Sequence, residues 1–120
     1  MVNHKPVIQM QAFIKQVGED IQVHEVRYHQ LHIHEIVVIN AEGIKVSEIS
    51  KEMDVVIRYG DSDGIAAPIE GLEAGKSLEL KGVYLEQNGD AYPSLAAAGP
   101  VLHYTHQPIG YIVYNGQRYE

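Results

Sequence analysis

The chain has 120 residues, with 9 Lys and Arg against 16 Asp and Glu, 7 His, 8 Tyr, 1 Phe and neither Cys nor Trp. This length suits one core, so we expect residues 1–120 to form a single domain. The absence of Cys excludes a disulfide scaffold, a thiolate zinc site and a cysteine nucleophile. No apolar run reaches the roughly 20 residues of a membrane-spanning helix, and the first residues lack a signal-peptide layout. The sequence therefore predicts a cytoplasmic protein, or an exported one if a signal segment was removed from its N-terminus.

The charge balance limits the partners. The formal net charge is −7 with His counted as neutral. Proteins that bind nucleic acid without sequence preference draw most of their affinity from Lys and Arg on phosphates, and neither half of this chain has a basic stripe. We therefore expect weak and salt-sensitive nucleic-acid binding at most, and no membrane binding. An uncharged or cationic ligand or a protein partner fits this charge better than a bare phosphate backbone does.

The first half of the chain alternates with a period of two, as strands do. The segment 8–14 also fits a helix stripe, but we favour a strand because Gly18 ends it. In the next segment, 28–39, we expect Leu31, Ile33, Val37 and Ile39 to face the core. The stretch 40–43 reads as a hairpin turn into a further strand, 44–49.

The second half continues this pattern. Leu78 and Leu80 alternate along one expected strand, in which Gly82 marks a bulge or a sharp bend, and Val101 is expected in the core. Asn88-Gly89 and Asn115-Gly116 are strong turn signals. The expected strands are 54–59, 77–86, 101–105, 110–114 and 117–119. Many strands with at most one or two short helices, the only candidate here being 66–75, indicate a small all-β barrel or sandwich.

Two segments imitate cofactor motifs. The stretch 71–77 has three residues between its glycines, where a phosphate-binding loop needs four, and a strand rather than a helix follows it. The stretch 61–64 lacks the ligand spacing of a calcium loop. We therefore expect a loop and a turn at these places, and no cofactor.

The cluster 29–35 holds the densest group of titratable side chains. On a strand, His32 and His34 share one face with Cβ atoms about 7 Å apart, which suits two ligands of one metal when a third ligand comes from another strand. Glu35 points to the opposite face and joins them only if the strand bulges. No third ligand is recognisably spaced, so two solvated histidines are the alternative interpretation, and we assign no metal site.

A second cluster lies near the C-terminus. His103 lies on a short strand, and Gln107-Pro108 breaks the strand so that His106 begins a loop at the rim. Together with Tyr104, these imidazoles can donate, accept and stack without a fixed charge near neutral pH. We therefore predict that His103, Tyr104 and His106 bind a ligand. The alternative is that they form ordinary cross-strand pairs that stabilise a sheet.

The segment Val101-Leu-His-Tyr-Thr-His106, followed by Gly110-Tyr-Ile-Val-Tyr-Asn-Gly-Gln-Arg-Tyr119, resembles the C-terminal signature of a family of uncharacterised small bacterial proteins. That family has a His-Trp-Thr-His motif and a closing Gly-Trp-Ile-x-x-Asn-Gly-x-x-Tyr motif, and Tyr104 and Tyr111 stand here in place of its Trp residues. The segment 75–84 is similar to a further family motif. The resemblance covers about the last third of the chain. It implies a small OB-like five-stranded barrel with short extra strands, and a label of nucleic-acid binding that rests on fold analogy.

Three functional hypotheses follow. The leading one is a non-catalytic OB-like binding module, whose ligand is a single-stranded nucleic acid or an oligosaccharide bound weakly. The second is a small metal-dependent enzyme of cupin type that uses His32 and His34, although the apolar residues 36–39 supply no acidic ligand after the pair. The third is a structural or interaction protein whose strand edges pair in an oligomer.

Overall fold

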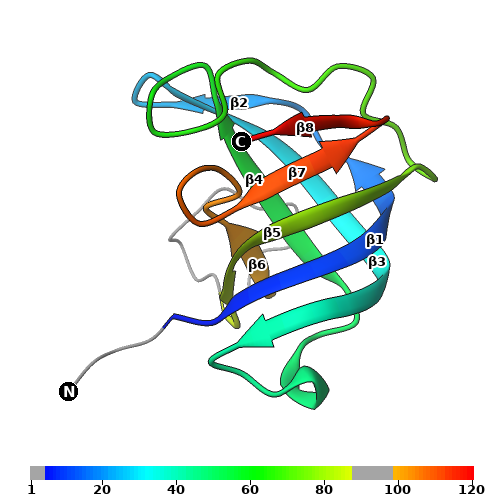
Figure 1. The fold of residues 1–120 in the computed structure, drawn as a ribbon. Coiled ribbons are helices and arrows are strands. Elements are labelled where there is room, and N and C mark those ends of the chain that lie inside the picture. Colours follow the sequence, from blue (N-terminus) through cyan, green and yellow to red (C-terminus); the bar gives the residue numbers. More distant parts are fainter. Residues whose placement is uncertain (1–4, 88–98) are drawn as a thin grey trace.

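The computed structural model describes residues 5–87 and 99–120, and strands dominate it (Figure 1). In chain order they are β1 (Val7–Val17), β2 (Ile21–Val23), β3 (Val26–Glu42), β4 (Met53–Tyr59), β5 (Ser77–Leu85), β6 (Val101–His103), β7 (Tyr111–Tyr114) and β8 (Gln117–Tyr119). The one helical segment in these two ranges is a 3-10 turn, η1 (Val46–Glu48). The described residues thus include no helix with the length and apolar character needed to span a bilayer. The all-β prediction is confirmed.

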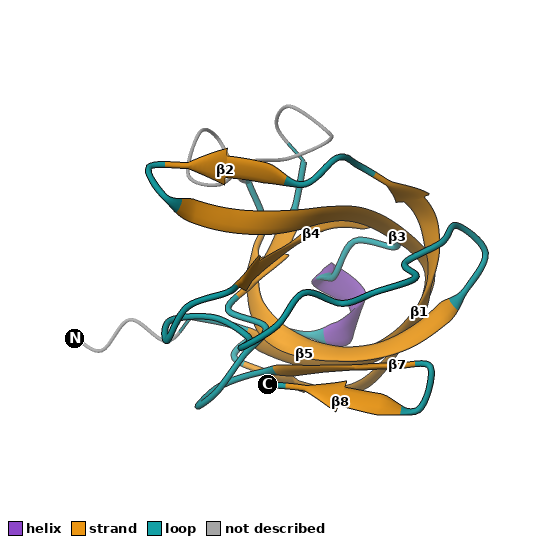
Figure 2. Cartoon of the chain, turned by 90° about the horizontal axis from the view of Figure 1, so that it is seen from above, coloured by secondary structure: helices purple, strands orange, loops and turns teal. Residues whose placement is uncertain are grey.

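Five of the strands close into a ring. β1 pairs with β3, β3 with β4, β4 with β6, β6 with β5, and β5 with β1 again. The β4–β6 pairing is parallel and the other four are antiparallel. The fourth ring strand, β5, thus lies beside the first, which is the Greek-key order, and β6 fills the gap between β4 and β5. Figure 2 looks into this ring from above.

Three short strands extend the ring. β2 forms a hairpin with the beginning of β3. β7 pairs with residues 79–81 of β5, and β8 pairs with β7 outside the ring (Figure 2). The β7–β8 turn is the expected one, because Asn115 and Gly116 have φ values of 51° and 75°, the positive φ pair of a tight hairpin turn. The predicted turn at Asn88-Gly89 lies outside the described residues.

The alternation of the strands supplies the core. On β1 the residues Ile8, Met10, Ala12 and Ile14 are buried, so the strand prediction is confirmed there. The expected core residues Leu31, Ile33, Leu78 and Leu80 belong to the same core cluster. Val101 is buried outside that cluster, and the core side chain of β6 is its neighbour Leu102. With Val55 and Ile57 from β4, core side chains come from all five strands of the ring.

Two predicted core positions are wrong. Val37 is 63% exposed and Ile39 is 50% exposed. From the pair Gln11–Val37 to the pair Phe13–His34, the chain advances three residues on β3 but only two on β1, and Glu35 has a φ of 51°. This extra residue is a β-bulge, which moves the side chains of residues 36–39 to the face opposite the expected one. A second register shift lies between Gln9↔Asn40 and Met10↔Val38. Partly buried residues, Ile36 and Val38, pack against the core instead.

The predicted hairpin at 40–43 and the predicted strand at 44–49 are also wrong. β3 continues to Glu42, and η1 follows a turn at Gly43, whose φ is 79°. Ile44 and Ile49 pack against the core from this segment, which lies at the lower end of the ring in Figure 1. The segment 66–75 contains no helix, and Ile69 within it is buried in the core. Loops with a few apolar anchors therefore contribute to the core beside the strands.

Candidate functional site

The three residues predicted to bind a ligand line one cavity of about 310 Å³. The cavity lies on the outer side of β3, β4 and β6. Val55 and Ile57 of β4 belong to the core cluster, whereas Val56, between them, points to the other side and lines the cavity. Residues from β3, β4 and the loop after β4 complete the lining: Tyr28, Val56, Arg58 and Asp63. The size corresponds to the lower end of the range of small-ligand pockets.

The backbone after β6 explains how two aromatic rings reach this cavity. β6 ends at His103, and Tyr104 has a φ of 57°, which turns the chain. Thr105 then points inward and is 1% exposed, whereas Tyr104 is 37% exposed. The Tyr104 and His106 rings stack with centroids 4.3 Å apart and an interplanar angle of 19°. The prediction that His106 lies beyond the end of the strand is confirmed.

Two glycines let the site segment lie tightly against β5. A Cβ atom at Gly82 would lie 2.5 Å from the carbonyl oxygen of His103, and one at Gly110 would lie 2.2 Å from the carbonyl oxygen of Lys81. The β1–β5 register shows no shift at Gly82, so the expected bulge is absent and the glycine serves close approach instead. The Gly110 N–H also donates to the His106 carbonyl at 2.7 Å. Backbone contacts thus hold the segment on the ring.

His103 forms the buried side of the cavity and is 7% exposed. Burial lowers its pKa to about 4, and the nearby positive charges of Lys5 and His106 act in the same direction. The imidazole is therefore neutral at physiological pH. It offers the cavity a polar ring without a charge.

Arg58 lines the cavity and is already paired. Its Nε donates to both carboxylate oxygens of Asp61 at 3.1 Å, and its Nη2 lies 3.6 Å from Asp63. The hydrogen bond from Arg58 lowers the pKa of the Asp61 carboxyl below its usual value, so both groups are charged. The ion pairs therefore neutralise the charge of Arg58 at the cavity. Tyr28 and Arg58 could not be found from the sequence pattern, because only the β3–β4 register sets them opposite each other.

His32 does not share a ligand set with His34. Its Nδ1 lies 2.7 Å from an Asp54 oxygen and its Nε2 lies 2.9 Å from a Glu52 oxygen. Burial alone lowers the pKa of His32, but the hydrogen bonds to Asp54 and Glu52 outweigh it and raise the pKa. Both ring nitrogens are thus engaged by carboxylates. The arrangement stabilises a protonated imidazole rather than leaving a lone pair for a metal.

His34 lies near a different acid. Its Nε2 is 3.6 Å from an oxygen of Glu35. The metal hypothesis needed a bulge to bring Glu35 to the side of the histidines, and β3 has that bulge at Glu35. Within residues 5–87 and 99–120, no group of three or more His, Asp or Glu side chains is arranged to hold a metal ion.

A third histidine, His29, lies in a buried network that sequence reasoning missed. Its Nδ1 lies 2.8 Å from Asp20, and the Ile69 N–H donates to its Nε2 at 2.9 Å. The Tyr59 hydroxyl donates to the other oxygen of Asp20 at 2.8 Å, and the Tyr59 and His29 rings stack 4.3 Å apart. Because the backbone occupies Nε2, the ring anchors the loop around Ile69 and is not open to a substrate.

The cavity therefore brings together His103, Tyr104 and His106, as predicted, whereas His32 and His34 each have separate partners. No protein family, no curated protein and no solved structure matches the chain.

Proposed function

We propose that this protein is a non-catalytic binding module with an OB-like ring, and that the cavity at His103, Tyr104 and His106 binds one ring of an oligosaccharide. OB-folds are five-stranded Greek-key barrels that bind oligosaccharides or oligonucleotides on the face of their second and third strands. The strand order agrees with this class, and β3 and β4 are the second and third strands of the ring. The observation that carries the proposal is that the cavity lies on these two strands and β6.

The aromatic lining supports a ring-shaped ligand. Tyr28, Tyr104 and His106 all line the cavity, and Tyr104, which stacks with His106, is 37% exposed, so part of its surface is accessible. Aromatic faces with polar tips suit a sugar, whose C–H faces pack on the ring and whose hydroxyls need hydrogen-bond partners. The neutral His103 adds such polar character within the cavity.

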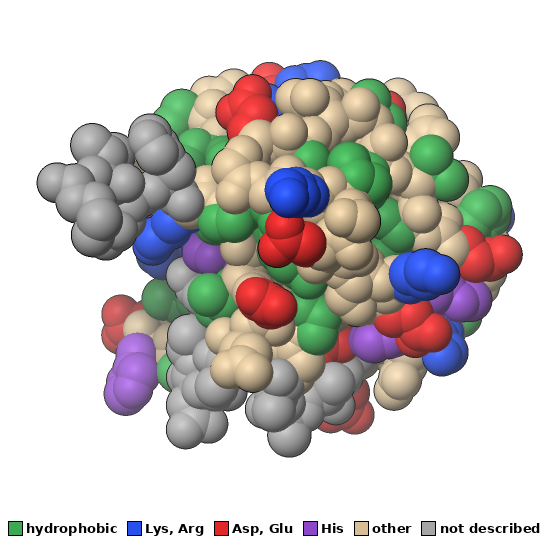
Figure 3. All heavy atoms as spheres, turned by 90° about the horizontal axis from the view of Figure 1, so that it is seen from below, with side chains coloured by type: hydrophobic (Ala, Val, Ile, Leu, Met, Phe, Trp, Pro, Cys, Tyr) green, Lys and Arg blue, Asp and Glu red, His purple; other side chains and the backbone are tan. Residues whose placement is uncertain are grey.

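The charges favour an uncharged ligand over a nucleic acid. Arg58, the cation of the cavity, is neutralised by Asp61 and Asp63, so a phosphate would have to displace a carboxylate. On the face that Figure 3 shows, Lys and Arg side chains lie apart from one another with acidic and hydrophobic groups between them. The net charge of −7 repels a polyanion at longer range. These features make an oligosaccharide the better ligand class.

A titration with variants tests the proposal. Uncharged oligosaccharides and a single-stranded oligonucleotide are each added to isotopically labelled protein while amide chemical shifts are followed, the oligonucleotide at two salt concentrations. We expect saturable shifts around Tyr104 with an oligosaccharide. The variant Tyr104→Asn should weaken binding about tenfold or more, because Asn tolerates the positive φ but removes the ring.

The matched control is His34→Ala, which removes a half-exposed ring outside the cavity and should leave binding unchanged. Absence of saturable binding by any oligosaccharide, or equal affinity for Tyr104→Asn, would contradict the proposal. Tight oligonucleotide binding at physiological salt would instead show that a nucleic acid is the ligand.

A further inference from the structure

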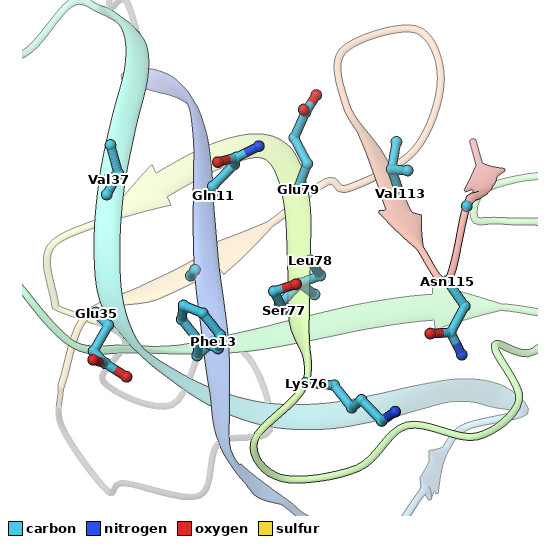
Figure 4. Close-up of a pocket in the computed structure, with 12 residues that line it drawn as sticks. Gln11, Phe13, Glu35, Val37, Lys76, Ser77, Leu78, Glu79, Val113 and Asn115 are labelled. Carbon is cyan, nitrogen blue, oxygen red and sulfur yellow. The ribbon is translucent and has the colours of Figure 1, made fainter.

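The outer face of β3, β1, β5 and β7 carries a groove in which apolar side chains lie among polar ones such as Gln11, Ser77 and Glu79. Phe13 is 41% exposed and Val37 is 63% exposed, and Val113 lines the same groove. The groove has a volume of about 520 Å³ and is open to solvent along the four strands (Figure 4). A face of an antiparallel sheet that stays in water usually alternates to polar residues. Exposed apolar side chains with polar residues around them are typical of a protein–protein contact surface.

Two opposite charges lie on either side of the groove's central ring. Glu35 lies on β3 to one side of Phe13, and Lys76, just before β5, lies to the other side (Figure 4). Glu35 is 69% exposed, and its close contact is the His34 ring at 3.6 Å. Lys76 is exposed and makes no ion pair within the described part of the chain. One surface thus presents an apolar centre with a negative group and a positive group on opposite sides.

We propose that this groove is the interface of a homodimer. In a two-fold interface the same patch faces itself, so each residue meets the residue on the opposite side of the axis. A two-fold axis that lies in the plane of the interface, over Phe13 and along β1, brings Glu35 of one copy to Lys76 of the other, and does so twice. The two Phe13 rings meet at the axis. Charge complementarity of the patch with itself therefore selects a second copy as the occupant over an unrelated partner.

The dimer leaves the ligand cavity open. The cavity is formed by the first half of β3 with β4 and β6, whereas the groove is formed by the second half of β3 with β1, β5 and β7. The two surfaces share no lining residue. Dimerisation and ligand binding can thus be tested separately.

Sedimentation velocity over a range of about 1–300 µM tests the proposal, because a weak symmetric interface dissociates in this range. We expect the wild type to pass from monomer to dimer as the concentration rises. The charge reversals Glu35→Lys and Lys76→Glu should each raise the dissociation constant about tenfold or more, because each sets like charges against one another at both ends of the interface. The double variant should restore the dimer, because it exchanges the two charges.

The control is Val46→Ser, which removes a valine that is 59% exposed outside the groove and should leave the dissociation constant unchanged. Circular dichroism and urea unfolding show whether each variant is folded. A wild type that is monomeric at all concentrations overturns the proposal. So does a dimer that tolerates both single reversals, or a double variant that fails to recover.

Discussion

Replacing His29 with Ala should destabilise the protein strongly, although the residue lines neither the ligand cavity nor the groove at Phe13. The change leaves the Ile69 N–H without its acceptor, and Ile69 is 4% exposed, so a buried donor is stranded at a cost of about 1–3 kcal/mol. Loss of the stacked contact with Tyr59 removes about 0.5–1.5 kcal/mol. The hydrogen bond to Asp20 contributes about 1 kcal/mol, because this half-exposed carboxylate regains water. We expect the free energy of unfolding to fall by about 3–5 kcal/mol.

Urea unfolding at neutral pH measures this loss, and hydrogen exchange at the Ile69 amide locates it. His34→Ala is the matched control on the same strand, since its side chain is 31% exposed and lies 3.6 Å from the exposed carboxylate of Glu35. That variant should change the free energy of unfolding by less than about 0.5 kcal/mol. If His29→Ala loses under about 1 kcal/mol and the Ile69 amide keeps its protection, the anchoring role assigned to His29 is incorrect.

Three further changes have expected outcomes. Because the folded state raises the pKa of His32, its contribution to stability is complete below the unfolded-state pKa of 6.5 and is lost as the pH rises through the folded-state pKa. His32→Gln should therefore lower the urea midpoint more near pH 6 than near pH 9. Equal losses at the two pH values would contradict the ion-pair assignment. Gly82→Ala should cost about 1–3 kcal/mol, because its Cβ would lie 2.5 Å from the His103 carbonyl oxygen, and an unchanged midpoint would exclude that close approach. Leu80→Ala should cost about 2–5 kcal/mol in urea unfolding, since the side chain is fully buried, and a loss below about 0.5 kcal/mol would place it outside the core.

Local periodicity was enough to predict most of the strands. Alternation identified β1 and β5, and the Asn115-Gly116 pair identified the turn between β7 and β8. The same rule failed at Val37 and Ile39, because one extra residue at the bulge reverses the alternation and a sequence carries no local sign of it. The strand predicted at 44–49 failed for a related reason, since Ile44 and Ile49 reach the core from a turn.

The candidate site was predictable only in part. His103, Tyr104 and His106 are close in the sequence, so a local pattern could find them. Tyr28 and Arg58 join them through the pairing of two strands, and such long-range register is not encoded in spacing along the chain. The role of His29 depends on three distant groups, and it was missed for the same reason.

The closure of the ring depends on its shortest member. β6 has three residues, yet it is hydrogen-bonded to β4 on one edge and to β5 on the other. Short ladders open locally at lower free energy than long ones, so the ring should open first at this junction. The ligand cavity spans the same junction, with Val56 on β4 and His103 on β6. A ligand that binds only the closed ring lowers the population of the open form by mass action, so slower hydrogen exchange at Val101 and Leu102 would report binding before the ligand's chemistry is known.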